Sequence, residues 1–408
     1  FKIRSTTGKL KKNNYLEKLY NSNKTLIIYK VDQGYDLYTD FSEKIVLSKK
    51  NINFFLNKIK NKNSKNKFLD LYIGFFGYEL LCNLINIKIP KQKNSNFSKS
   101  IFYKPETKIE IRKSINIKSN LKNYKNLFRK QTFQKTKILS PFKVNLDFMK
   151  YKKIFNMFSK KIRAGDTYQI KICTKYINKS LINPVSFFWK LMKTNASPES
   201  FMIRDHNYSI VSCSPENLIN IKGNRIITKP IAGTLRKTKK TNLSYALKFF
   251  KQNIKETKEH NMIVDMERSD LSKICKPGSV KLIKTKYVEQ YKHLYHYVSS
   301  IGGILNKNIK LIEIIKAMMP GGSVIGCPKI NTLKLLNNQE KYNRNIYTGS
   351  FGIIKFNLDM RFNIIIRSIL NYKNKSEISV ASGVVVDSTA KKEFNENYIK
   401  AKSLLDLY

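Results

Sequence analysis

The chain has 408 residues, of which 41% are apolar, including 24 Phe and 23 Tyr, so it can bury a substantial core and is not intrinsically disordered. Lysine and arginine total 78 against 28 aspartate and glutamate residues, which gives a formal net charge of +50. The excess is lysine interleaved with asparagine, isoleucine and tyrosine along the whole chain, without an arginine- and aromatic-rich stripe. We therefore interpret it as the bias of an AT-rich genome and expect no nucleic-acid partner, with a basic polyanion-binding protein as the remote alternative.

No uninterrupted apolar run reaches the roughly eighteen residues that a membrane span needs, so no membrane association is expected. The 5 cysteines are widely separated and form no C-x-x-C pair, which argues against a disulfide scaffold and a structural zinc site. This cysteine usage suits a reducing compartment, and we expect the protein in the cytoplasm. The first residue is Phe1 and not Met, so the completeness of the N-terminus stays open.

The first portion of the chain, residues 1–140, is the more lysine- and asparagine-rich one, and we expect it to pack into the same unit as the rest. Its one sharply apolar island, LDLYIGFFGYELL at 69–81, predicts a buried strand with close backbone approach at Gly74 and Gly77. Residues 88–140 alternate short β-like runs with polar stretches, which predicts a meander with long loops.

From Asp147 onward, over residues 147–408, the periodicity becomes regular. Apolar residues at helical spacing predict helices over 147–165, 184–194, 243–267, 309–318, 328–337 and 390–405. Alternating and β-rich runs predict strands over 167–177, 201–212, 218–229, 346–356, 361–371 and 377–386. This mixed pattern, with neither an internal repeat nor a low-complexity linker, predicts an α+β fold with much antiparallel sheet.

Acidic residues are scarce, so their clusters carry more information than usual. Glu256 and Glu259 lie one turn apart on the helix predicted at 243–267, and Glu393 and Glu396 share one face of the last helix. Carboxylates on two separate helices are candidate ligands for a hard cation such as Mg²⁺. The alternative is that they are solvated helix faces paired with the abundant lysines.

Three other features offer chemistry at smaller scale. The segment PGGSVIGCPK lacks the context of a nucleotide loop, but its backbone N–H groups and Lys329 at a helix start can cradle a carboxylate. His296 is a candidate acid or base, or alternatively a satisfied core histidine. Arg367, between isoleucines in a predicted strand, must either reach solvent or bind an anion, and bidentate carboxylate binding suits arginine best.

Nine segments together resemble the chorismate-utilising enzymes, which include the large (synthase) subunits of anthranilate synthase and aminodeoxychorismate synthase and the isochorismate and salicylate synthases. The resemblance is strong over 150–408 and weak over 1–140, where only GFFGYEL contributes. In chain order the segments are AGDTYQI, CSPENLI, KPIAGTLRK, EHNMIVDMERSDLSKIC, YHYVSS, PGGSVIGCPK, YTGSFG, NIIIRS and ASGVVVDSTAKKEFNEN.

The resemblance implies two stacked, mostly antiparallel β-sheets flanked by helices, with chorismate and one Mg²⁺ in a cleft between them. By motif, Glu259 and Glu396 are similar to the magnesium carboxylates, with Glu393 and Glu256 nearby. His296 matches the histidine near the departing 4-hydroxyl. The positions that hold the substrate's carboxylates match Tyr347, Arg367, Gly383 and Lys329 at the enolpyruvyl end and Gly233 and Thr234 at the ring carboxylate.

Two positions bear on the reaction. Where the isochorismate and salicylate synthases have a water-activating lysine, this chain has Gln169, which cannot act as that base, so ammonia is the expected nucleophile. Ala232 stands where aminodeoxychorismate synthases commonly have a nucleophilic lysine and where anthranilate synthases have alanine. The other motifs favour the aminodeoxychorismate branch, which we prefer, and the anthranilate branch stays open. No glutaminase segment is present, so we expect ammonia from a separate glutamine amidotransferase subunit.

Overall fold

The computed structural model describes residues 12–62, 68–89, 97, 100–122, 136–238, 240–291 and 294–408, without the side chains of 12–15, 232, 234, 236 and 255. Much of the meander predicted at 88–140 therefore lies outside the described residues, while 100–122 form strands as expected.

The helices and strands alternate along the chain in the mixed order that the sequence predicts. The helices are α1 (Lys12–Tyr20), α2 (Ile52–Lys60), α3 (Tyr78–Leu84), α4 (Phe148–Arg163), α5 (Pro184–Thr194), α6 (Leu243–Gln252), α7 (Ile254–Ser272), α8 (Leu311–Met318), α9 (Lys329–Gln339) and α10 (Ala390–Leu405). The strands as far as β10 are β1 (Leu26–Val31), β2 (Gly34–Val46), β3 (Leu71–Phe76), β4 (Ser100–Ile111), β5 (Ile115–Ser119), β6 (Lys137–Ile138), β7 (Lys143–Val144), β8 (Gln169–Leu181), β9 (Phe201–Arg204) and β10 (Tyr208–Ser212). The remaining strands are β11 (Asn217–Lys222), β12 (Arg225–Thr228), β13 (Ile231–Arg236), β14 (Lys281–Gln290), β15 (Leu294–Ile304), β16 (Gly326–Cys327), β17 (Ser350–Lys355), β18 (Met360–Ile364), β19 (Ser368–Tyr372) and β20 (Lys375–Val384).

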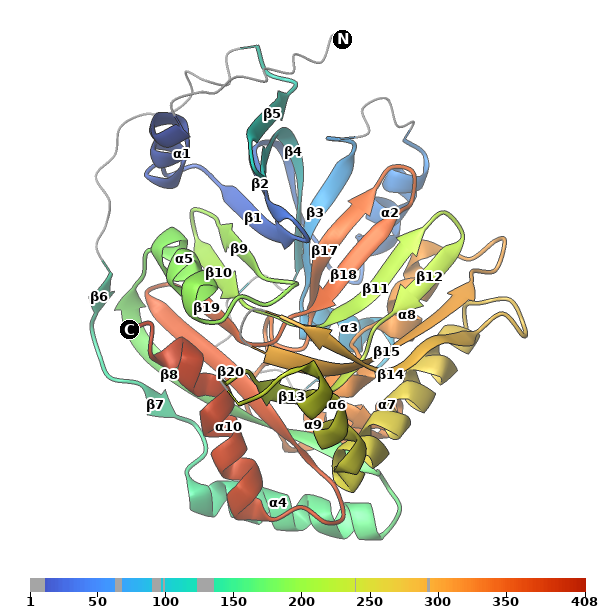
Figure 1. Cartoon of the computed structure of the whole chain (residues 1–408). Coiled ribbons are helices and arrows are strands. Elements are labelled where there is room, and N and C mark those ends of the chain that lie inside the picture. The colour runs from blue at the N-terminus through green and yellow to red at the C-terminus, as the bar shows by residue number, and fades with distance from the viewer. Residues whose placement is uncertain are drawn as a thin grey trace.

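The longer strands form one continuous antiparallel ladder. The order is β8–β20–β19–β10–β9–β1–β2–β4–β3–β17–β18–β11–β12–β15, with β13 and β14 also paired to β15. In Figure 1 the N-terminal strands lie at the top, and α4 and α10 lie at the bottom. The α+β class with an antiparallel sheet and flanking helices is confirmed.

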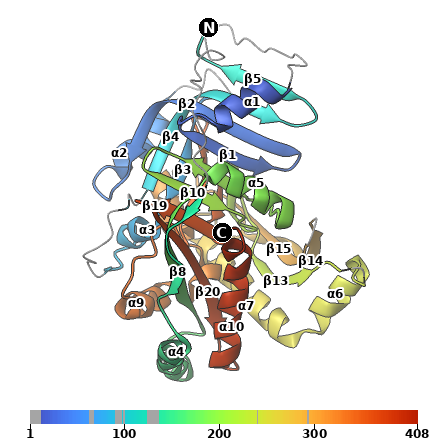
Figure 2. The same ribbon diagram turned by 90° about the vertical axis from the view of Figure 1, so that its left-hand side faces the viewer.

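The core lies in three layers that follow from the alternation of side chains along each strand. In the central layer, Ile27 and Tyr29 of β1 pack with Ile73 and Phe75 of β3. On the opposite face of β1, Leu26 and Ile28 pack beneath α5 and α10. On the opposite face of β3, a larger cluster lies beneath α2, α3, α7, α8 and α9. Figure 2 shows α5 and α10 outside the strands that they cover.

Local chemistry explains where the helices next to the site begin and end. The Asp147 side chain accepts a hydrogen bond from the Lys150 N–H at 2.9 Å and caps α4, whose chain then turns at Gly165 with φ of 81°. Asn253 has an extended backbone and caps α7 by accepting from the Glu256 N–H at 3.2 Å. The single helix predicted at 243–267 is therefore wrong, because Asn253 divides it into α6 and α7.

Two other expectations need correction. The apolar run 69–81 is a strand only as far as Phe76, and Gly77 begins the buried helix α3, because a fully buried run shows no periodicity that separates the two states. Arg367 does not lie within a strand. It occupies the break between β18 and β19, with φ of 50°. The helices predicted at 184–194 and 390–405 are confirmed to the residue.

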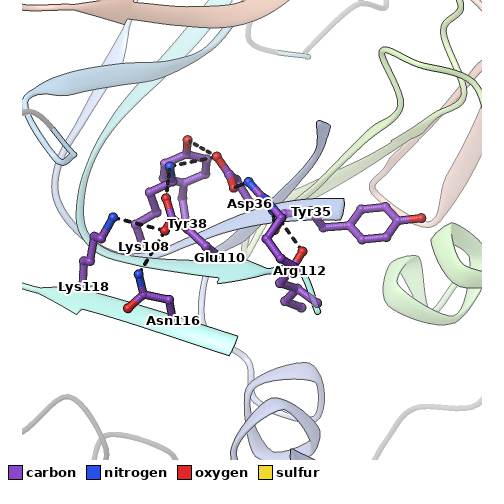
Figure 3. A network of polar contacts seen from close by, with 9 residues as sticks. Tyr35, Asp36, Tyr38, Lys108, Glu110, Arg112, Asn116 and Lys118 are labelled. Carbon is purple, nitrogen blue, oxygen red and sulfur yellow. Dashed lines mark hydrogen bonds and ion pairs between the residues drawn. The ribbon is translucent and has the colours of Figure 1, made fainter. Parts of the chain in front are cut away.

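The N-terminal portion shares its sheet with the remainder of the chain, since β1 pairs with β9 and β3 pairs with β17. On β2, β4 and β5, scarce carboxylates are bound by lysine and arginine in a cross-strand network (Figure 3). Lys108 lies 2.9 Å from both Asp36 and Glu110, and Lys118 lies 3.1 Å from Glu110. No helix in the described part of the chain combines the length and apolarity that a membrane crossing requires.

The buried carboxylate of Glu199 ties the two portions together, because it accepts from Tyr29 of β1 at 2.5 Å and from Arg361 of β18 at 2.7 Å. Arg361→Met leaves this carboxylate, 2% exposed, without its cation, and we expect a loss of about 2 kcal/mol in the free energy of urea unfolding. As a control, Lys402→Met removes an exposed pair with Asp406 and should cost less than about 0.5 kcal/mol. Equal losses in the two variants would show that Glu199 is not a junction.

Candidate active site

The candidate site begins where β8 runs antiparallel to β20, with Lys171 opposite Gly383. Gln169 and Lys171 are two residues apart on β8, so their side chains project from the same face. A side-chain carbon added at Gly383 would lie 2.8 Å from both Gln169 Nε2 and Lys171 Nζ. The missing side chain of Gly383 thus makes room for these two polar groups.

Helix α7 brings Glu259 to these groups. Its Oε1 atom accepts a hydrogen bond from Gln169 Nε2 at 2.7 Å and lies 3.4 Å from Lys171 Nζ. Burial alone would raise the pKa of Glu259, but the charge of Lys171 and the bond from Gln169 outweigh it and lower that pKa. Glu259 is therefore a carboxylate held ionised by β8.

Helix α10 brings Glu396 to the same place from another direction. Glu396 lies 2.6 Å from Lys400 one turn later, and the Lys400 ammonium also donates to the carbonyl of Ala381 at 2.9 Å. Burial would raise the pKa of Glu396, but Lys400 and then Lys171 lower it, while the nearby charge of Glu259 raises it. The two carboxylates are thus electrostatic neighbours, with Lys171 close to both.

Arg367 and His296 lie at the other side of this group. Arg367 is half-buried, and the charge of its guanidinium acts on His296, Glu216 and Lys400. His296 on β15 is fully buried, and burial followed by the charge of Arg367 lowers its pKa to about 4. Glu216 is also buried and accepts from Ser323 at 2.6 Å, and burial raises its pKa to about 7. A neutral imidazole therefore lies beside a fixed positive charge.

Strand β13 borders the site through its backbone. Gly233 pairs with Tyr297 and Thr234 pairs with His296 on β15, and the register shifts at Ala232. A side-chain carbon at Gly233 would lie 3.3 Å from Glu256 Oε2, so Glu256 faces this strand. The side chains of Ala232 and Thr234 lie outside the description, and only their backbone positions are known.

Two of the predicted site residues, Tyr347 and Lys329, have other principal contacts. Tyr347 packs with Cys173, Ala381 and Ile366, and so borders the site through the neighbours of Arg367 and Gly383. The Lys329 ammonium is bound by Asp270 at 2.5 Å and by the carbonyl of Ala317 at 2.7 Å. Its positive charge is therefore engaged in a buried ion pair.

Glu393 lies in the first turn of α10, where it is buried and accepts a hydrogen bond from Ser388 at 2.8 Å. A separate groove with a volume of about 1190 Å³ lies elsewhere, between α1, the β9–β10 turn and the β19–β20 turn, and is lined by Lys44, Asp205 and Tyr208 among others. The candidate site is therefore defined by its converging side chains, not by that groove.

Sequence reasoning missed Lys171, Lys400 and Glu216. Lys171 is two positions after Gln169 on a strand, and Lys400 is four positions after Glu396 on a helix. Glu216 lies within the CSPENLI segment. Spacing was the available signal, but lysine is so frequent in this chain that neither lysine stood out.

Glu259 and Glu396 suit Mg²⁺ in donor chemistry, because they are ionised carboxylates from two separate helices. Each has a lysine as its present partner. Within the described residues, no set of three or more His, Cys, Asp or Glu side chains is arranged to hold a metal ion. Two carboxylates alone would leave most of the coordination sphere of Mg²⁺ to oxygens from substrate or water.

The sheet thus carries a cluster of carboxylates and ammonium groups that suits the binding of a charged small molecule. The chain matches the chorismate binding enzyme family over residues 11–406 and belongs to that family. It is 34% identical over 241 residues to aminodeoxychorismate synthase component 1 of Bacillus subtilis (strain 168), a match covering 59% of this chain and 51% of that protein. The match thus spans about half the length of that relative.

Other relatives belong to the second branch of the family. An anthranilate synthase component I-like protein of Synechocystis sp. (strain PCC 6803) is 30% identical over 365 residues, covering 86% of this chain and 75% of that protein. The crystal structure of anthranilate synthase component I from Streptococcus pneumoniae TIGR4 superposes with a TM-score of 0.75 at 25% identity, covering 95% of this chain and 91% of that chain. Similarity therefore supports both branches.

The depressed pKa of His296 predicts how the folded protein responds to acid. Between pH 6.5 and about 4 the unfolded chain binds a proton at this position that the folded chain does not, so acidification favours unfolding. Wild-type protein should lose more unfolding free energy than His296→Gln between pH 7 and pH 4, and NMR titration should show a neutral His296 imidazole at pH 6. Parallel stability profiles and an imidazole that titrates near pH 6.5 would contradict this.

Proposed function

We propose that this chain catalyses the Mg²⁺-dependent amination of chorismate, in which ammonia replaces the 4-hydroxyl to give 4-amino-4-deoxychorismate and water. The observation that carries the proposal is the convergence of Glu259, Glu396, Lys171 and Arg367 from four separate segments. A partly buried group of paired opposite charges suits a substrate with two carboxylates better than an apolar one.

Each residue has a distinct part in this proposal. Arg367 binds the enolpyruvyl carboxylate, because its guanidinium is permanently charged and its charge acts on the buried His296. Magnesium, held by Glu259 and Glu396, would supply a Lewis acid that neutralises the ring carboxylate. His296 is neutral at physiological pH, so it can hydrogen-bond to the 4-hydroxyl, while the attacking ammonia supplies the proton with which that group leaves as water.

Gln169 disfavours water as the nucleophile that attacks the ring. Its amide donates to Glu259 at 2.7 Å, and an amide has no basic nitrogen with which to activate a water molecule. Ammonia is itself a nucleophile and needs no such base. This supports amination over hydration at the same ring.

The second candidate is conversion of chorismate to anthranilate and pyruvate. Ala232 favours it, because alanine supplies no amine to add covalently to the ring before ammonia does. The order and the residues of the other motifs, together with the Bacillus subtilis relative, favour the aminodeoxychorismate branch. We prefer the latter and treat the product as the main point to be tested.

A separate glutamine amidotransferase is the proposed source of ammonia. The names of the relatives describe them as component 1 or component I, which fits an enzyme completed by another chain. Ammonium salts at alkaline pH should replace this partner in an assay, because they supply free ammonia directly.

The test of the function is to incubate the protein with chorismate, Mg²⁺ and ammonium salt and to measure products. Aminodeoxychorismate is detected as 4-aminobenzoate after addition of a lyase, and anthranilate by its fluorescence without lyase. Glu396→Gln should lower turnover at least about a hundredfold through loss of a charged ligand, and Asp406→Asn, an exposed control on the same C-terminal segment, should retain it. Lack of any chorismate consumption by the wild type would refute the proposal.

Ala232→Lys tests which branch the site supports. An amine at this position should suppress anthranilate formation, because it occupies the ring position to which ammonia must add to give anthranilate. We expect the ratio of anthranilate to aminodeoxychorismate to fall at least about tenfold, measured by chromatography of the same reactions. An unchanged ratio would show that residue 232 does not control the product.

A further inference from the structure

The Lys171 ammonium lies beside Glu259, and the charge of Glu396 also acts on it; these are the two carboxylates that the proposed function assigns to the metal. It lies 3.4 Å from Glu259 Oε1, and its side chain is only 13% exposed. Burial would lower its pKa, but the charges of Glu259, Glu396 and Glu216 outweigh burial and raise it. A single buried ammonium thus balances a group of carboxylates.

The protein fixes the root of this side chain from both sides. The Lys171 N–H donates to the carbonyl of Ile325 at 3.1 Å, and the Lys171 carbonyl accepts from the buried Arg344 at 3.2 Å. The ammonium itself lies where a side chain on Gly383 would otherwise sit. Lys171 is therefore directed into the cluster by its backbone and is not a surface lysine that happens to fold inward.

Lys400 is also near, but its surroundings differ. It belongs to the same helix as Glu396, four residues on, and its ammonium is shared between Glu396 and the carbonyl of Ala381. Lys171 comes from another element and acts on both Glu259 and Glu396. Of the two lysines, Lys171 is the one that comes from a separate strand and interacts with both carboxylates.

We propose that Lys171 is a built-in counter-cation that competes with Mg²⁺ for Glu259 and Glu396, so that this chain binds the metal weakly unless the lysine side chain is displaced. The inference rests on the metal assignment in the proposed function. Two carboxylates alone present a charge of minus two to a divalent ion, and an adjacent ammonium cancels half of that attraction and repels the ion directly. The lysine stem is flexible enough to move aside when metal and substrate arrive together.

The experiment measures Mg²⁺ binding without turnover, by calorimetric titration and by the rise in melting temperature with added Mg²⁺. Lys171→Gln should bind Mg²⁺ at least about tenfold more tightly than the wild type and gain more thermal stability from it. The matched control is Lys175→Gln, on the same strand, whose still more deeply buried ammonium is paired with Glu377 at 2.5 Å. That variant should lose stability but keep the wild-type Mg²⁺ dissociation constant.

Lys171→Arg gives a second test, which does not require that a variant without the positive charge at residue 171 folds. This variant keeps the positive charge, and its guanidinium can donate two hydrogen bonds to one carboxylate. Mg²⁺ should therefore bind to it no more tightly than to the wild type. Tighter binding by this variant would overturn the inference.

The outcomes separate the inference from the proposed function. Equal Mg²⁺ affinity in wild type and Lys171→Gln would overturn the role of Lys171 and leave the metal assignment standing. Lack of Mg²⁺ binding in every variant would overturn both, and chorismate consumption with ammonium would then decide whether the amination proposal survives without the metal.

Discussion

The neutralisation of carboxylates that are partly withdrawn from water is the constraint on which the candidate site depends. The side chain of Glu259 is 22% exposed and that of Glu396 is 47% exposed, and the two come from helices that are far apart in sequence. They are brought together because β20 pairs with β8 over its whole length, with α10 packed on β20 and Lys171 projecting from β8. The site is therefore a product of the sheet register: a slip of one residue would turn Gln169 and Lys171 to the opposite face.

The parts of the fold that the sequence predicted well are those with a clear period and a local end signal. The helix at 184–194 begins with the Asn183 cap and a proline, and α4 begins at Asp147 and ends before Gly165. Prediction was wrong where burial was complete or where one residue ended a helix against the local period. Gly77 turns an apolar run from strand to helix, and Asn253 interrupts a continuous helical pattern. Neither break changes the hydrophobic pattern that carried the prediction.

The site was predictable only as a set of motifs, because no spacing within one segment shows that α7, α10 and the β18–β19 break meet. The resemblance supplied that long-range information for Glu259, Glu396, Arg367 and His296. It could not supply the pairings that depend on this chain's own lysines. In a chain with 78 basic residues, Lys171 is one lysine among many until a structure shows its ammonium beside Glu259.

The excess of lysine in the whole chain also affects the carboxylates of the candidate site. Where described carboxylates are buried or half-buried, basic groups repeatedly neutralise them, as in the network of Asp36 and Glu110 on the N-terminal strands and in the Lys329–Asp270 pair. A composition so rich in lysine makes stable ion pairs easy to form, but it also lets an ammonium occupy space that a divalent metal requires. A functional carboxylate in such a chain must therefore either exclude lysine or exchange it for the incoming ligand. Gly383 leaves room for Lys171 rather than excluding it, so exchange is the arrangement that this site supports.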